Sequence, residues 1–204
     1  PSSPLGLAAD AVVKLEAGTE QAVAATKTYV NSLGAIALIF ATTTGDSQAF
    51  AELEAVPGQI EAQLERSWND VSGLDKLGAV DGGTVVARGI NYCTSHEIAL
   101  KIRELSGLVT EESSPAAQLP GRVAAIGEGW PVILVAPSGP ARPSVEEVVA
   151  PLVARGARLV AVSDVQAVLR RAHTRLPLVP HVPEWLSPLT AVVPGQMTAL
   201  RLTE

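Results

Sequence analysis

Residues 84–106 read TVVARGINYCTSHEIALKIRELS, and this stretch decides the expected fold. The run at 84–87 is typical of a buried strand, and the pattern after it predicts a helix over about 94–106. A strand that leads through a short loop into a helix is the building unit of parallel α/β sheets. The sequence therefore predicts one such unit at this point of the chain.

The same alternation of strand and helix continues towards the C-terminus. Strands are expected at 109–110, 131–136 and 158–162, and helices at about 144–155, 165–171 and 188–202. Gly156 is the expected stop of the first of these helices, and Pro194 predicts a kink or a late start in the last. This succession predicts an α/β fold, a doubly wound parallel sheet flanked by helices with right-handed crossovers.

The N-terminal third has a different character. A short β-like run at 11–15 precedes an Ala-rich helical segment at about 21–42, for which Thr19 is the candidate N-cap. A second helix is expected over 50–68, and Asp81-Gly82-Gly83 is expected to break the chain. The two helices are interpreted as a connector between units.

Composition excludes several classes of protein. With 204 residues, 47% of them hydrophobic and 3% aromatic, a core of Ala, Val, Leu and Ile is expected. The formal charge is −6 and Lys and Arg form no dense cluster, so nucleic acid is not an expected partner. Cys93 is the single cysteine, which excludes an internal disulfide and fits a cytoplasmic protein. No Cys/His spacing suggests a metal site.

The chain shows no sign of a membrane segment. Its apolar stretch at 33–40 is too short to span a bilayer, and the N-terminus lacks the order of a signal peptide. We therefore expect a soluble protein. Because the sequence opens at Pro1 without an initiator Met, we also expect it to be a C-terminal portion of a longer chain.

Three charged residues of the 94–106 helix share one side of it. Glu97, Lys101 and Glu104 lie on one stripe, while Ile98, Ile102 and Leu105 are expected to face the core. One interpretation is a solvated salt-bridge face, worth roughly 0.2–0.5 kcal/mol for an i,i+4 pair. The other is a cleft in which Glu104, beside Lys101, acts as a general base with a perturbed pKa.

Other candidate features are less specific. Loops 88–92 and 137–139 are expected at the carboxyl edge of the sheet, where such folds bind ligands. Small residues at 17–27 either let a ligand approach the backbone or serve helix packing. His96 is interpreted as a helix-start residue, His173 as solvated in a basic loop, and His181 as structural.

Several ordered motifs together resemble one family. They are AGTE at 17–20, VAATK at 23–27, RGINY at 88–92, EIALKIRE at 97–104, WPVILVAP at 130–137, PEWL at 183–186 and PGQ at 194–196. The chain is similar over nearly its whole length to the sugar isomerase (SIS) domain family. Within it, the resemblance is to the isomerase half of glucosamine-6-phosphate synthases and to SIS-type glucosamine-6-phosphate deaminases.

The resemblance implies a double-SIS architecture with the first domain truncated. Residues 1–45 would be the C-terminal remnant of the first domain, 46–76 a helical connector and 77–204 the second domain. The family's Ser/Gly/Thr-rich phosphate loop would belong to the missing part. A homodimer is also implied.

The resemblance also implies a function and a set of residues. It implies an isomerase or deaminase of an amino-sugar or ketose 6-phosphate, without a metal or redox cofactor. Glu104 would move a proton between C1 and C2, assisted by Lys101, and Glu97 would hold Lys101. Substrate contacts are expected at Val23, Ala25, Thr26 and Glu97.

Two departures from the family pattern favour an alternative. Pro120 stands where the family has a ring-opening histidine, and the chain ends at Arg201-Leu202-Thr203-Glu204 without the family's tail lysine. The alternative is a non-catalytic SIS module that binds a phosphosugar as a sensor.

Overall fold

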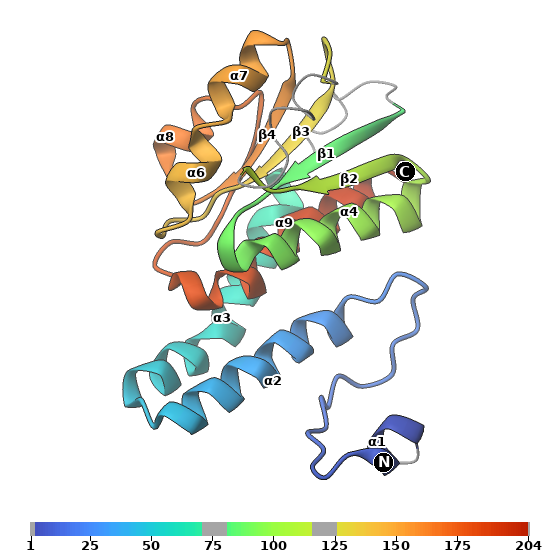
Figure 1. Ribbon diagram of the computed structural model, residues 1–204, viewed down its shortest axis with the longest axis vertical. Helices are drawn as coiled ribbons and strands as arrows, with labels where there is room; N and C mark the ends of the chain where they lie inside the picture. The colour runs from blue at the N-terminus through green and yellow to red at the C-terminus, as the bar shows by residue number, and fades with distance from the viewer. Residues whose placement is uncertain (1–2, 71–80, 116–125, 204) are drawn as a thin grey trace. The chain divides into compact units, whose positions relative to one another are not determined.

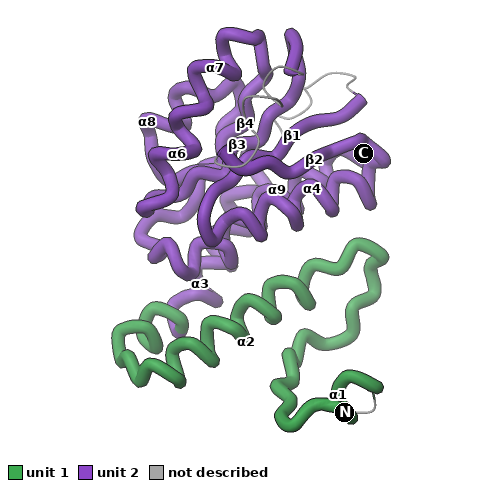
Figure 2. Tube along the Cα trace, viewed as in Figure 1, with its two compact units in different colours: residues 1–53 green, residues 54–204 purple. Residues whose placement is uncertain are grey.

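The computed structural model of the protein describes residues 3–70, 81–115 and 126–203 (Figure 1). The chain divides into two compact units, residues 1–53 and residues 54–204 (Figure 2). The boundary falls within helix α3, Ser47–Asp70, which carries the predicted second helix. Each unit is described below by itself.

Unit 1 contains helix α1, Pro4–Ala8, an extended segment, and helix α2, Lys27–Thr44. The predicted β-like run at 11–15 is wrong: it forms no strand, and most of its side chains are exposed. The helix expected from residue 21 begins at Lys27, so Thr19 is not its N-cap. Instead, the Glu20 carboxylate accepts hydrogen bonds from the backbone N–H and the hydroxyl of Thr28, both at 3.0 Å. Glu20 thereby caps the first turn of α2.

Unit 2 contains a five-stranded parallel sheet, which confirms the predicted fold class. Its strands are β1, Gly82–Val86; β2, Val109–Ser113; β3, Pro131–Val135; β4, Arg158–Ser163; and β5, Thr174–Pro177. Their order is β2-β1-β3-β4-β5, and every pairing is parallel. From β1 the chain therefore continues to the edge strand β2 on one side of the sheet, and from β3 it continues through β4 to β5 on the other side.

Helices cover both faces of this sheet (Figure 1). Helices α4, Tyr92–Ser106, and α9, Ser187–Arg201, lie on one face. Helices α6, Arg142–Glu146; α7, Val149–Ala154; and α8, Gln166–Leu169, lie on the other. Short 3-10 turns, Gly89–Asn91 and Glu184–Leu186, precede α4 and α9.

Each face of the sheet has its own apolar core, built from aliphatic residues as the composition predicts. Val85 packs with Ile98 and Ile102 of α4 on one face, and its neighbour Val86 packs with the α6–α8 residues on the other. Because side chains alternate along a strand, a fully buried strand serves both cores.

The strands and helices of unit 2 differ from the sequence predictions in several places. Gly82 and Gly83 do not break the chain but begin β1: a Cβ on Gly82 would lie 2.1 Å from the carbonyl oxygen of Val109, so only glycine allows this approach to β2. The helix expected over 144–155 is divided into α6 and α7, because Pro151 cannot donate a hydrogen bond to the preceding turn. Strand β5 was not predicted and occupies part of the supposed basic loop.

Helix α9 begins at Ser187 and continues through Pro194, so of the two expected effects of Pro194, a kink or a late start, the late start does not occur. It lies beside α4 (Figure 1), and Gly195 faces Ile98: a Cβ on Gly195 would lie 2.2 Å from Cγ1 of Ile98. Ile98 is fully buried and has little room to move. The close approach of the two helices therefore depends on the missing side chain at Gly195.

We predict that Gly195→Ala destabilises the protein by about 1–3 kcal/mol, the usual cost of overpacking a core. Urea unfolding followed by circular dichroism measures the change. Gly58→Ala is the matched control, since its added Cβ meets nothing within 4 Å in helix α3 and should raise stability by up to about 1 kcal/mol. Equal stability of the Gly195→Ala variant and the wild type would show that α9 can move without cost.

Candidate active site

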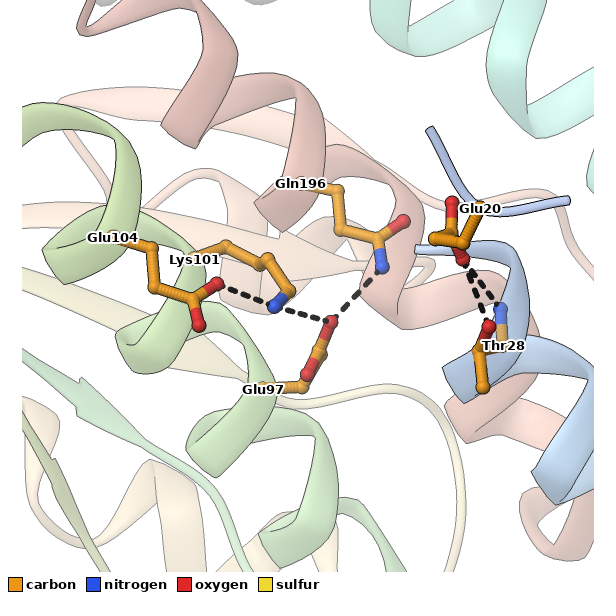
Figure 3. Close-up of polar contacts among 6 residues, drawn as sticks. All are labelled: Glu20, Thr28, Glu97, Lys101, Glu104 and Gln196. Atoms are coloured by element: carbon orange, nitrogen blue, oxygen red, sulfur yellow. Dashed lines mark hydrogen bonds and ion pairs between the residues drawn. The ribbon is translucent and has the colours of Figure 1, made fainter. Parts of the chain in front are cut away.

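Helix α4 brings together the three charged residues predicted from the sequence. The Lys101 ammonium lies 2.7 Å from Oε2 of Glu104 and 3.7 Å from Oε1 of Glu97. Gln196 of α9 donates a hydrogen bond from Nε2 to Oε1 of Glu97, at 3.3 Å. These four side chains, shown in Figure 3, form the candidate site in unit 2.

The interpretation of these charges as a solvated face is wrong for two of the three residues. Only 3% of Lys101 and 6% of Glu97 are exposed, whereas the Glu104 side chain is 33% exposed. Leu105, expected in the core, is 39% exposed. The buried face of α4 is therefore rotated relative to the prediction, so that it includes Glu97 and Lys101.

The two carboxylates differ in environment. Burial raises the pKa of Glu97, and this effect outweighs the attraction of Lys101 and the hydrogen bond from Gln196, which lower it. Glu104 is the carboxylate that solvent can reach. The Glu97 carboxylate is thus held inside beside Lys101, while the Glu104 carboxylate is partly open to solvent.

We predict that stability attributable to Glu97 falls as pH rises. A raised pKa means that the folded protein retains a proton that the unfolded chain has already lost, so the folded state is favoured at the lower pH. Relative to Glu97→Gln, the wild type should lose stability as pH rises from 4.5, the group's ordinary value, through its raised pKa. Urea unfolding of both proteins between about pH 4 and 8 measures the difference. A difference that instead grows with pH would contradict the assignment.

Lys101→Met should destabilise the protein by about 3–5 kcal/mol, because it leaves the Glu97 carboxylate buried without its counter-charge. Adding Glu97→Gln to this variant should restore part of the loss. Arg66→Met is the control, since Arg66 forms an exposed pair with Asp70 at 4.0 Å and its loss should cost about 1 kcal/mol or less. Additive effects of the two site substitutions would show that the pair is not coupled.

The predicted substrate contacts Val23, Ala25 and Thr26 lie together in unit 1, in the segment before α2. Val23 is 96% exposed, while Ala25 and Thr26 are half-buried. Two contacts hold the ends of this segment: Nζ of Lys27 donates to the carbonyl of Thr19 at 2.9 Å, and Glu20 binds Thr28 (Figure 3). The pKa of Glu20 is lowered, and the main cause is the hydrogen bond that its carboxylate accepts from the backbone N–H of Thr28.

Sequence reasoning assigned no role to Gln196 or to Glu20. Gln196 belongs to the PGQ motif, but its contact with Glu97 joins residues 99 positions apart. Glu20 contacts Thr28, eight positions away, without any helical spacing. No periodicity in the sequence signals either contact.

Each of the three histidines has a different environment. His96 is exposed, with Nδ1 3.4 Å from Glu112 and its ring edge-on to Tyr92. His173 is exposed as expected, but it precedes β5 directly, and its Nδ1 accepts a hydrogen bond from the backbone of Leu159. His181 has a left-handed backbone, with φ of 64°. Pro120 lies outside the described residues.

The described residues contain neither a cluster of metal ligands nor a membrane-spanning helix. Over residues 3–70, 81–115 and 126–203, no group of three or more His, Cys, Asp or Glu side chains could hold a metal ion. Within the same ranges, no helix combines the length and the apolar character needed to cross a membrane.

Comparison with known proteins defines the class. The family model for the SIS domain matches residues 84–203, which include most of β1, the helix α4 and the other four strands of the sheet. The chain belongs to the SIS domain family. This confirms the resemblance seen in the sequence motifs.

The chain is also similar in sequence to an individual curated protein. It is 32% identical over 198 residues to a glutamine–fructose-6-phosphate aminotransferase [isomerizing] of Methanothermobacter thermautotrophicus, covering 94% of this chain and 33% of that protein. The chain thus spans about a third of the length of this relative. The residues that it shares with the relative do not by themselves fix its own reaction.

Solved structures confirm the fold. The C-terminal domain of glucosamine-fructose-6-phosphate aminotransferase from Francisella tularensis matches with a TM-score of 0.80 and 22% identity, covering 91% of this chain and 55% of that one. Glucosamine-6-phosphate deaminase from Thermotoga maritima matches with a TM-score of 0.73 and 20% identity, covering 91% and 53%. At these identities the likeness concerns the fold.

Proposed function

We propose that the protein is a phosphosugar isomerase or deaminase that acts on an amino-sugar or ketose 6-phosphate by proton transfer between C1 and C2. The observation that carries the proposal is the contact of the buried Lys101 ammonium with Glu104, a carboxylate that remains one-third exposed. Membership of the SIS family and the names of the relatives, which include aminotransferases and a deaminase, support the substrate class.

In the proposed deaminase reaction Glu104 is the base. It takes the proton from C2 of open-chain glucosamine 6-phosphate, the C–H electron pair forms the C1=C2 bond of an enolamine, and O1 gains a proton. Glu104 then returns its proton to C1 as the amine nitrogen loses a proton to solvent, which leaves a hydroxymethyl group at C1, with O1 still protonated, and an imine at C2. Water adds to this imine and ammonia leaves, which gives fructose 6-phosphate. One carboxylate can serve both carbons because they are neighbours.

The other residues have supporting roles in this proposal. Lys101 stabilises the negative charge that develops on the substrate oxygen, and Glu97 keeps Lys101 in place. Val23, Ala25 and Thr26 contact the sugar through the segment that Lys27 and Glu20 hold. By its resemblance to the family we also infer a homodimer in the cytoplasm.

A second candidate function is phosphosugar binding without turnover. Pro120, at the position of the family's ring-opening histidine, favours it, because proline has no group that can donate a proton to the ring oxygen. The protein would then act as a sensor.

We predict that Glu104→Gln lowers turnover of glucosamine 6-phosphate by about 10²–10⁴-fold, the usual contribution of a general base, while substrate binding is retained. A coupled assay for ammonia and fructose 6-phosphate measures turnover, and calorimetry measures binding. Glu61→Gln, a change of an exposed carboxylate on α3, is the control and should leave turnover unchanged. Binding without turnover in the wild type would favour the sensor, and full activity of Glu104→Gln would exclude this base.

A further inference from the structure

Helices α4 and α9 are joined by a polar contact directly beside their closest packing. Gly195 of α9 faces Ile98 of α4, where an added Cβ would lie 2.2 Å from Cγ1. The next residue on α9, Gln196, donates a hydrogen bond of 3.3 Å to Glu97, the residue before Ile98 (Figure 3). The glycine that lets the two helices approach therefore also brings the Gln196 amide within reach of the Glu97 carboxylate.

Burial makes this hydrogen bond important to Glu97. Only 6% of Glu97 is exposed, so its carboxylate has lost most of its contact with water. The Lys101 ammonium stays 3.7 Å from Oε1 of Glu97, while it lies 2.7 Å from Glu104. The Gln196 amide, at 3.3 Å, is closer to this Glu97 oxygen than the ammonium is. Gln196 therefore replaces part of the hydration that Glu97 loses on burial.

Opposing influences decide whether Glu97 carries a charge. Burial is the largest and raises the pKa of Glu97, and the charge of Glu104 acts in the same direction. The attraction of Lys101 and the hydrogen bond from Gln196 lower this pKa. An amide suits the task because it donates a hydrogen bond without titrating itself. The charged residues on the other elements that pack against α4 are Glu111, Glu112 and Arg201.

Lys101 links the charge of Glu97 to Glu104. While Glu97 is a carboxylate, two negative groups share one ammonium. When Glu97 takes up a proton, the ammonium is left to Glu104 alone, and the repulsion between the two carboxylates disappears. Both changes stabilise the charged form of Glu104 and make it a weaker proton acceptor. The charge on Glu97 therefore supports the basicity of Glu104.

We propose that Gln196 is a positioning residue: its hydrogen bond holds Glu97 in the charged form beside Lys101, and through this shared ammonium it sets how readily Glu104 accepts a proton. The effect on Glu97 follows from the contacts between α4 and α9. The effect on catalysis rests on the proposed function, in which Glu104 is the base. Gln196 thereby sets the lower limit of the pH range in which the site can work.

Gln196→Met tests the effect on Glu97, because methionine has nearly the volume of glutamine but cannot donate a hydrogen bond. NMR of the 204-residue chain, labelled with ¹³C at the glutamate carboxyl carbons, follows the titration, and Glu97→Gln assigns the Glu97 signal. We expect the midpoint of Glu97 to rise by about 0.5–1 pH unit, as loss of a long hydrogen bond to a charged group should produce. Gln196→Asn, whose shorter amide cannot reach Glu97, should shift it in the same direction.

Gln48→Met is the matched control, since Nε2 of Gln48 donates to Oε1 of Glu52 at 2.9 Å on the exposed surface of α3. It removes the same kind of contact and should leave the titration of Glu97 unchanged. Melting temperatures show that each variant is folded. An unmoved Glu97 midpoint in folded Gln196→Met and Gln196→Asn would overturn the proposal.

Turnover of glucosamine 6-phosphate gives the second measurement. In Gln196→Met the fall of kcat at acid pH should move upwards by the same amount as the Glu97 midpoint, with KM unchanged. A merely structural role would lower kcat without moving the pH at which it falls. A shifted Glu97 midpoint with an unshifted pH profile would overturn the catalytic part of the proposal. A wild type without turnover would refute the proposed function, while the NMR titration would still decide the role of Gln196.

Discussion

The burial of the Lys101 ammonium is the interaction on which the candidate active site depends. A charge with 3% of its residue exposed is unstable in a protein interior unless a counter-charge is close. Helical spacing supplies two counter-charges: Glu97 lies one turn before Lys101, and Glu104 lies almost one turn after it. The same lysine thus requires one carboxylate to be inside with it and fixes the position of another at the surface.

The difference between the two carboxylates follows from their surroundings. Glu97 lies under α9, accepts a hydrogen bond from Gln196 and has a raised pKa because of burial. Glu104 is closer to the end of α4 and keeps a third of its side chain in solvent. Groups of identical chemistry acquire separate roles when their environments differ in this way.

Much of the fold could be predicted from local pattern. The strands at 84–87, 131–136 and 158–162 are short, largely apolar runs rich in valine, and the helix at 94–106 has clear periodicity. The predictions that are wrong depend on contacts between segments distant in sequence, or on a single residue that interrupts an otherwise regular helical or strand pattern. The sequence predicts a break at Gly82 because it does not reveal the proximity of Val109, and it predicts one continuous helix over 144–155 although Pro151 interrupts the helical hydrogen bonds.

The site was predictable only in part, for the same reason. Spacing placed Glu97, Lys101 and Glu104 on one stripe, and this is confirmed. It could not decide whether the stripe is solvated, because α9, some 90 positions later, covers it through Gly195 and Gln196. Val23, Ala25 and Thr26 are in a separate unit, and their part in the site stays a prediction.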